Sequence, residues 1–299
     1  MAEKHHYLPV FYLKEFIGER PPSGQEPYLW IYSFDKEKWK NKAPKKVASE
    51  PDLYAVDDEY ENKRYDVERA LSKLEGKMAP IYKMKIKSEL VRYDRSIIAE
   101  FVSLMIIRTL KYKKMVSDFV VEIANKIIHC WQSQPTYYRA FIELYKTETG
   151  KDMPEKLPPD LLANLDIQAS PDFFVEMMIK LLPNIKNDII QMNWTFLYAK
   201  DQDYFITSDS PVTFFNPDVR LNFGGYDLKN SEFYFPLSKE ICMILSHNFK
   251  LRQTLDVPIS VVETINKRTV YSSHKFVIAP KKDFIGASYL KSKSSTYIE

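Results

Sequence analysis

The chain begins with two adjacent histidines, side chains that can act as a general base, a metal ligand or a pH-responsive donor. Pro9 restricts Leu8 to an extended conformation. In an extended segment His6 and Leu8 point to one side and His5 to the other, so at most one histidine joins Leu8 in the core. His6 is our candidate, with two open interpretations: a catalytic or ligand role, or a buried hydrogen-bonding residue that anchors the N-terminus.

An arginine lies in the middle of an apolar helical stripe. With residues about 100° apart on a helix, Arg108 falls among the apolar positions of a helix expected from about 94 into the 110s. An unpaired buried charge is very costly, and a planar guanidinium suits carboxylate and phosphate equally. One interpretation is an ion pair with Glu68, Glu75 or Asp209. The other is a side chain that points into a pocket and holds a phosphate or a catalytic carboxylate.

Three carboxylates could hold a metal or move a proton. Glu68 and Glu75 share one face of a predicted helix, where they could bind Mg²⁺ or Mn²⁺ through oxygen, although a solvated face is the interpretation we favour. Asp209 follows a predicted strand in the run TSDSP, where it could ligate a metal or act as a general base. Ser208 could donate a hydrogen bond there. A turn closed by these side chains explains the same run equally well.

A basic segment has strict alternation. Lys36, Lys38, Lys40 and Lys42 recur with a period of two, so in a strand they share one face, opposite Trp39. A basic strand with a nearby aromatic ring suits single-stranded nucleic acid. An edge strand protected by lysines is the alternative, and the net charge of only +3 favours it.

The candidates come from three zones that must fold together to bring them into one site. The zones are N-terminal strands at 5–56, a helical region at 64–192, and strands with one helix at 193–290, before a tail at 291–299. Strands on both sides of a helical middle predict an α+β fold. We expect one domain, 1–299, in which N- and C-terminal strands share a mixed or antiparallel sheet beside a central helical subdomain.

Three local predictions are specific enough to test. Spacing predicts a separate helix over 118–131, after the helix that carries Arg108. Segments 194–199 and 204–207 flank the sequence KDQD, which predicts a β-hairpin. The polar tail 291–299 is expected to be frayed.

Composition excludes several classes of protein. The 299 residues are 45% hydrophobic, which is typical of a folded chain and not of a disordered one. The two cysteines match no zinc or disulfide framework, no apolar run could cross a membrane, and the start lacks a signal-peptide pattern. We therefore expect a reducing, cytoplasmic setting. Glycine motifs for dinucleotides, P-loops and hydrolase elbows are absent.

Several short motifs occur in a characteristic order along nearly the whole chain. They are KHHYLPVFYLKEF, ERALSKLEGKMAPIYK, the triplet IRT at 107–109, FITSDSPV at 205–212, FPLS at 235–238, and Asn266 in a late helix. In this order they resemble the mostly bacterial family catalogued as domain of unknown function 4238. The resemblance implies motif positions and no reaction; these positions are His6, Pro9, Glu75, Arg108, Asp209 and Pro211. Many relatives have Asn where this chain has Ser210.

Together, the candidates favour a metal-assisted phosphodiesterase or nuclease that acts on nucleic acid or a nucleotide. Glu75 and Asp209 would hold Mg²⁺ or Mn²⁺. His6 would move a proton, and Arg108 would stabilise the developing phosphate charge. The predicted substrate-binding residues are Lys38, Lys40, Lys42, Ser208 and Asn266.

The alternative is a non-enzymatic binding or regulatory module with a protein partner, for example in bacterial phage defence or a toxin-like system. The same residues would then form a buried polar network that specifies the packing. Full burial with satisfied hydrogen bonds favours the network, whereas an open cleft with unpaired carboxylate oxygens favours catalysis. A third possibility, a hydrolase that uses Ser208, requires a histidine within reach of that hydroxyl.

Overall fold

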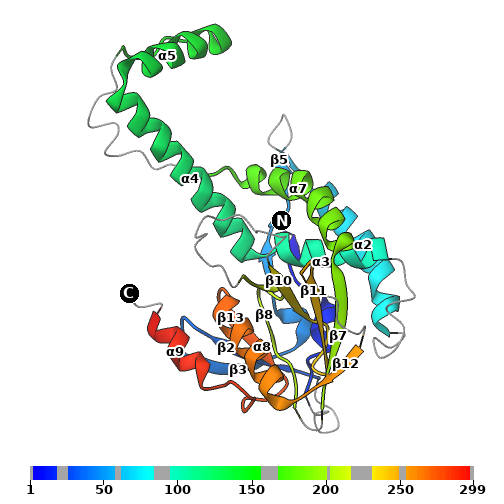
Figure 1. Ribbon diagram of the computed structural model, residues 1–299. Coiled ribbons are helices and arrows are strands. Elements are labelled where there is room, and N and C mark those ends of the chain that lie inside the picture. The colour runs from blue at the N-terminus through cyan, green and yellow to red at the C-terminus, as the bar shows by residue number, and fades with distance from the viewer. Residues whose placement is uncertain are drawn as a thin grey trace.

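The chain folds into a mixed α+β structure with two main sheets (Figure 1). The computed structural model describes residues 3–18, 26–57, 62–83, 95–155, 168–200, 203–216, 231–248 and 254–296. No helix within these ranges is both long and apolar enough to cross a membrane.

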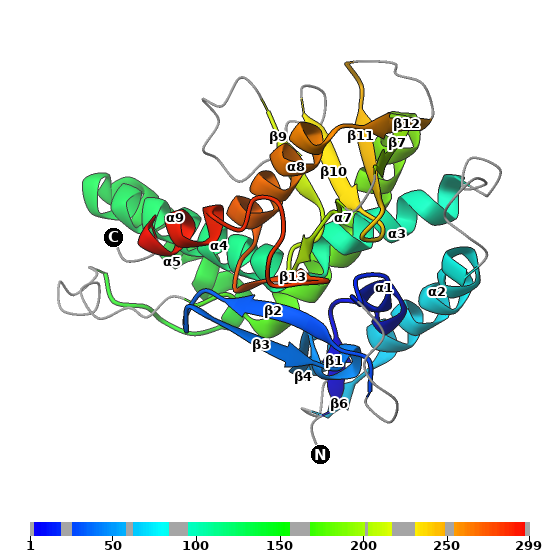
Figure 2. The same cartoon turned by 90° about the horizontal axis from the view of Figure 1, so that it is seen from below.

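The larger sheet has five strands and is covered by helices on both faces (Figure 2). Its order is β12 (Thr254–Val257), β7 (Asn193–Ala199), β11 (Ile241–Ser246), β10 (Glu232–Pro236) and β9 (Thr213–Phe215). Neighbours are antiparallel except β12 and β7, which are parallel. Every residue of β11 is buried, because alternate side chains enter different hydrophobic clusters on the two faces.

The smaller sheet joins the two ends of the chain. Its order is β3 (Lys38–Lys42), β2 (Leu29–Ser33), β13 (Phe276–Ala279) and β8 (Thr207–Ser208), all antiparallel. N-terminal and C-terminal strands therefore share a sheet, as the α+β prediction requires. Two short ribbons pair β1 (Lys4–His6) with β4 (Ser49–Pro51) and β5 (Val56–Asp57) with β6 (Lys63–Arg64).

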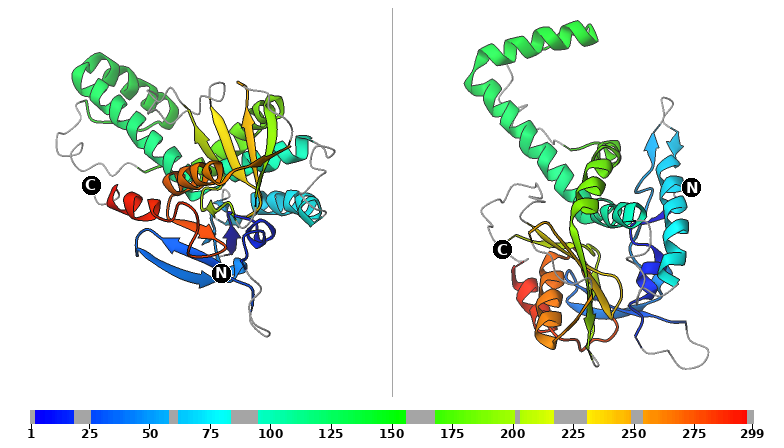
Figure 3. Two further views of the ribbon diagram at one scale, coloured as in Figure 1. Left: turned by 60° about the horizontal axis from the view of Figure 1, so that its bottom comes forward. Right: turned by 45° about the vertical axis from the view of Figure 1, so that its right-hand side comes forward.

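Helices cover the sheets and extend beyond them. They are α1 (Val10–Lys14), α2 (Asp66–Lys83), α3 (Arg95–Ile107), α4 (Leu110–Ser133), α5 (Pro135–Thr149), α7 (Pro171–Gln191), α8 (Ile259–Ser272) and α9 (Tyr289–Thr296). In α3, Ile98, Ala99 and every residue from Phe101 to Ile107 are buried, so the second half of this helix lies wholly in the core. The far half of α4 and all of α5 project from the body as an arm (Figure 3). On α5, Tyr138 is buried, and its ring packs near Trp131 of α4.

The predicted boundary between two helices is wrong. The first ends at Ile107, and one continuous helix, α4, replaces the expected segment 118–131. Thr109 causes the break, because it is extended and its side chain accepts a hydrogen bond from the backbone N–H of Tyr112. The apolar residues on both sides of this N-cap conceal it in a periodicity analysis.

Two further predictions are also wrong. Segments 194–199 and 204–207 form no hairpin, since β7 lies in the large sheet and β8 in the small one. Phe205 and Ile206 join different hydrophobic clusters, so the chain passes between the sheets at this point. The tail is helical up to Thr296, and Lys293 on α9 is buried; residues 297–299 lie outside the described ranges.

Candidate functional site

The motif residues lie inside the protein, and Arg108 has the most demanding position among them. Its side chain is 2% exposed at the end of α3, where the break before Thr109 turns it toward α2. The guanidinium donates to Glu75 Oε1 at 2.8 Å and to the backbone carbonyl of His6. The Tyr54 hydroxyl donates to the backbone carbonyl of Arg108 at 2.7 Å. Arg108 therefore forms the structural ion pair that was one of its two interpretations.

A second carboxylate lies beside this pair. One oxygen of Glu68 is buried and has no hydrogen-bond partner in the described part of the chain, and the same holds for Nε of Arg108. Burial raises the pKa of Glu68; Arg108 opposes the rise and Glu75 adds to it. Glu68 and Glu75 thus both act electrostatically on one guanidinium, and the Glu75–Arg108 ion pair connects α2 with the end of α3.

The two histidines exchange the roles that the sequence suggested. His5 is 1% exposed, accepts a hydrogen bond from the backbone N–H of Tyr54 at its Nδ1, and stacks on the Tyr54 ring. His6 is half-buried, and its Nε2 lies 3.1 Å from the carbonyl oxygen of Lys45. The buried anchor of the N-terminus is therefore His5, because the β1–β4 ribbon directs this side chain inward.

Asp209 holds a particular segment of backbone in place. It is 1% exposed, and its two oxygens accept hydrogen bonds from the backbone N–H groups of His274 at 2.8 Å and Lys275 at 2.5 Å. Burial raises its pKa to about 6, against the lowering effect of these hydrogen bonds. The carboxylate thereby fixes the entry to β13, where the side chains of His274 and Lys275 line two different hollows.

Ser208 and Asn266 are also buried and hydrogen-bonded. The Ser208 hydroxyl closes a turn with the backbone of Ser210, accepting from its N–H and donating to its carbonyl. The Asn266 amide accepts from the N–H of Ile206 and donates to the carbonyls of Tyr204 and Ile285. Ser208 therefore stabilises a local turn. Asn266 connects α8 with two segments that are distant from it in sequence or lie beyond the next strand.

The predicted metal ligands have separate partners. Glu75 is paired with Arg108, and both oxygens of Asp209 face backbone N–H groups. Among the described residues, no group of three or more His, Cys, Asp or Glu side chains could hold a metal ion. Binding of Mg²⁺ or Mn²⁺ by Glu75 and Asp209 stays a prediction, and it requires that these existing hydrogen bonds give way.

The lysines surround a hollow of about 210 Å³ beside the small sheet. Lys40 and Lys42 of β3 line it together with Lys36, Lys46 and Lys275. Lys38 continues the same face of β3, and Trp39 packs on the opposite face of the sheet against Tyr32 and Phe284. The alternation in the sequence thus separates charge from core, and β3 is an edge strand.

This lysine hollow has little acidic character. Glu50 is the acidic side chain among its lining residues, and Oε1 of Glu50 lies 3.8 Å from Nζ of Lys275. Lys36, Lys40 and Lys42 make no ion pair within the ranges that the structure describes. The hollow therefore attracts anions.

Sequence reasoning missed the contribution of Lys275. It lies far from β3 in sequence and reaches the hollow because β13 pairs with β2, which pairs in turn with β3. No spacing signal could have identified Lys275, because long-range strand pairing alone brings it there. His274 had no recognisable ligand spacing either.

Comparison with known proteins agrees with the motif order. Residues 4–283 match the model of the family described as "Protein of unknown function (DUF4238)". No match was found among curated proteins or among solved structures. The family match covers nearly the whole chain, and the protein is therefore a member of the DUF4238 family.

Proposed function

We propose that this protein is a binding module for the phosphate backbone of nucleic acid, which it holds in the lysine hollow beside β3. One observation carries the proposal: a single small hollow is lined by the five lysines Lys36, Lys40, Lys42, Lys46 and Lys275. Lysine-rich surfaces bind nucleic acid mainly by neutralising phosphates and releasing counterions.

The position of the aromatic side chains defines the mode of binding. Trp39 packs into the opposite face of the sheet, so no base stacks on it from the lysine side. Tyr7, which lines the hollow, is 2% exposed. Contacts of this kind fix the backbone and carry little base preference. We therefore expect weak sequence selectivity and a strong dependence on salt.

The buried motif residues support this site indirectly. Asp209 orients the backbone of Lys275, and Arg108 binds the carbonyl of His6 next to Tyr7. Arg108, Asp209, Ser208 and Asn266 are all buried and hydrogen-bonded, the arrangement expected for a structural polar network. In this proposal they are positioning residues.

The test is binding of labelled oligonucleotides, measured by fluorescence anisotropy. Wild type is titrated with single-stranded DNA, RNA and duplex DNA between 50 and 200 mM salt. With about four phosphate contacts to a single strand, log affinity should fall with log salt with a slope of about −3. The double variant Lys40→Glu/Lys42→Glu should bind at least about tenfold more weakly at low salt, since it reverses two charges in the hollow.

The matched control is Lys73→Glu/Lys77→Glu on α2, which makes the same change in net charge at two exposed positions. It should retain affinity within about twofold. Equal weakening by both double variants would mean that net charge, and not the lysine hollow, causes the loss of affinity. An absence of binding by wild type would refute the proposal outright.

The hypothesis from the sequence goes further than binding, because it also predicts metal-assisted cleavage of the bound nucleic acid. The same oligonucleotides, incubated with Mg²⁺, Mn²⁺ or EDTA, test it directly. Metal-dependent cleavage that folded Asp209→Asn and His6→Ala variants lose would assign these residues to a nuclease site. Binding without cleavage would leave the module as a binder.

A further inference from the structure

A second hollow, separate from the lysine hollow, runs between α4 and α7. It is a groove of about 880 Å³, within the range of small-molecule sites. Its apolar lining comes from both helices: Met115, Val116, Phe119 and Ile123 of α4, and Phe173, Met177 and Leu181 of α7. Phe119 and Ile123 are 57% and 40% exposed, so the groove presents apolar surface to solvent.

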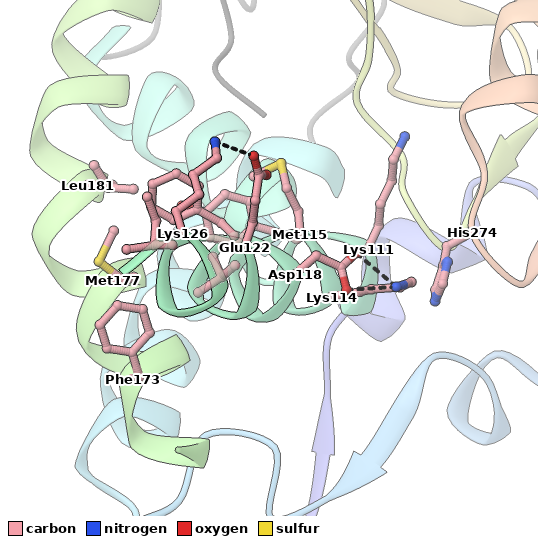
Figure 4. Close-up of a pocket in the computed structure, with 14 residues that line it drawn as sticks. Lys111, Lys114, Met115, Asp118, Glu122, Lys126, Phe173, Met177, Leu181 and His274 are labelled. Atoms are coloured by element: carbon pink, nitrogen blue, oxygen red, sulfur yellow. Dashed lines mark hydrogen bonds and ion pairs between the residues drawn. The ribbon is translucent and has the colours of Figure 1, made fainter. Parts of the chain in front are cut away.

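One end of the groove is basic. In Figure 4, Phe173, Met177 and Leu181 lie at one end, and Lys111, Lys114 and His274 lie at the other. Burial lowers the pKa of His274, and four nearby lysines lower it further. Those lysines are Lys275, Lys111, Lys114 and Lys293. An apolar groove with a cationic side chain at one end is complementary to an amphipathic anion.

Lys111 is the cation that lacks a counter-charge in contact. Its ammonium group donates to the carbonyl and the hydroxyl of Ser272, at 2.7 and 3.1 Å, and makes no ion pair within the described ranges. An ammonium group has three donors, so one stays available. Burial lowers the pKa of Lys111, and nearby Asp209, whose two oxygens accept from backbone N–H groups, opposes this lowering.

The other charges along the groove are compensated. Lys114 is paired with Asp118, and Lys126 with Glu122. The lowered pKa keeps His274 largely neutral at pH 7. Among the lining residues that the structure describes, the uncompensated charge is therefore that of Lys111, which matches a ligand with a single negative charge.

We propose that the groove between α4 and α7 binds a long-chain carboxylate, with its alkyl chain between the two helices and its head group at Lys111. The groove runs along α4 from Lys111 to Lys126, about 22 Å at 1.5 Å per residue, so it accommodates an extended chain. The site does not depend on the proposed nucleic-acid binding, because its lining residues differ from those of the lysine hollow.

The test compares three probes by isothermal titration calorimetry, all below micellar concentrations. Dodecanoate should bind with one site per chain. Butyrate keeps the carboxylate and loses most of the chain, so it should bind at least about 100-fold more weakly. Dodecyltrimethylammonium keeps the chain and reverses the charge, and should bind at least about tenfold more weakly. Comparable affinity for the cation, or no binding of dodecanoate, would overturn the proposal.

Variants then separate the head-group site from the chain site. Lys111→Met should weaken dodecanoate about tenfold and should not weaken the cationic probe, because the change removes a charge that repels it. Phe119→Ser, at an exposed position that tolerates the change, should weaken both probes severalfold. Lys73→Met on α2 and Ile259→Ser, 51% exposed on α8, are the matched controls and should bind dodecanoate as wild type does.

Sedimentation of wild type and Phe119→Ser without ligand identifies the competing occupant, a second copy of the chain. A wild-type dimer that this variant dissociates would assign the groove to self-association and overturn the ligand proposal. A wild type that stays monomeric and binds dodecanoate supports it.

Discussion

Two regions of this protein use charged residues in opposite ways. In the motif network, Arg108 and Asp209 are almost fully buried and have specific partners. In the lysine hollow, Lys40 and Lys42 are exposed, and in the described part of the chain neither makes an ion pair. Buried charges must be paired because desolvation is costly, whereas exposed charges are free to meet a ligand.

The residues that identify the family and the residues that face the hollows belong to different sets. The unusual residues that identify the family are those that hold the backbone together, and the residues that face open hollows are ordinary lysines. Asp209 connects the two regions, since it fixes the backbone from which His274 and Lys275 reach their hollows. A motif can therefore serve a site without touching its ligand.

The most severe break in the network should come from Arg108→Met. The change leaves the Glu75 carboxylate and the His6 carbonyl without their donor, and we expect a loss of about 3–5 kcal/mol in the free energy of unfolding. Urea denaturation followed by circular dichroism measures it. Arg69→Met is the control, because that side chain is 69% exposed and its pair with Asp66 is screened by solvent and contributes little. Similar losses in both variants would contradict the buried network.

At pH 4, Asp209→Asn should cost about 2–3 kcal/mol of folding stability, because one amide oxygen cannot accept from both backbone N–H groups. It should also weaken binding in the lysine hollow, since Lys275 loses its fixed backbone. Urea denaturation and oligonucleotide anisotropy measure the two effects. Asp57→Asn, at an exposed position, should change neither. Unchanged binding by a folded Asp209→Asn variant would remove the proposed link between the regions.

The pH dependence of stability isolates the same carboxylate. The pKa of Asp209 in the folded protein, about 6, exceeds the ordinary value of 3.8. Its contribution to stability is therefore complete below pH 3.8 and is lost as the pH rises through 6, by at most about 1.4 kcal/mol per pH unit. The stability difference between wild type and Asp209→Asn should shrink from pH 4 to pH 6.5. A difference that grows over this range would mean that burial is not the dominant influence.

Substitution of the two histidines should cause smaller losses of stability that differ between His5 and His6. His5→Leu leaves the buried backbone N–H of Tyr54 without its acceptor and should cost about 2 kcal/mol. His6→Leu removes a half-buried contact with the Lys45 carbonyl and should cost less than about 1 kcal/mol. Thermal and urea unfolding of the two variants rank them. The reverse order would place the N-terminal anchor at His6.

The smallest effect on folding should come from the lysines. Lys42→Gln is expected to alter stability by no more than about 0.5 kcal/mol, because the side chain is exposed and makes no ion pair with any residue that the structure describes. Its loss should nevertheless reduce the salt slope of single-strand binding by about 0.7, the value for one phosphate contact. Lys73→Gln provides the reference. A stability loss above 1 kcal/mol would show that Lys42 belongs to the structure and not to the binding face.

Much of the architecture was predictable because it depends on local pattern. The predicted helical region 64–192 contains α2, α3, α4, α5 and α7, and alternation placed the β3 lysines on one face with Trp39 on the other. The burial of Arg108 also followed from its place in an apolar stripe, although the choice of Glu75 as its partner did not. Motif order identified the family, which the match over residues 4–283 confirms.

The errors occurred where tertiary packing overrides local sequence. The segment after β7 resembles a hairpin, yet Phe205 and Ile206 gain more by entering two separate cores. The polar tail forms α9 because Lys293 donates to the carbonyl of Val270 and to Ser273 at the end of α8. Neither the core nor these acceptors can be recognised within a short window of sequence.

The sequence alone determined that Arg108 lies in an apolar stripe, which face of the β3 segment carries charge and which family the chain belongs to, since these properties depend on residue type and spacing. Only the tertiary structure decided which charges are satisfied and which stay available. Pairing of β13 with β2 brings Lys275 to the lysines of β3, and the packing of α4 beside α7 creates the groove that ends at Lys111. The physical reason is that a charge is neutralised by the groups that lie near it in space, and contacts between strands and helices far apart in sequence determine which groups these are.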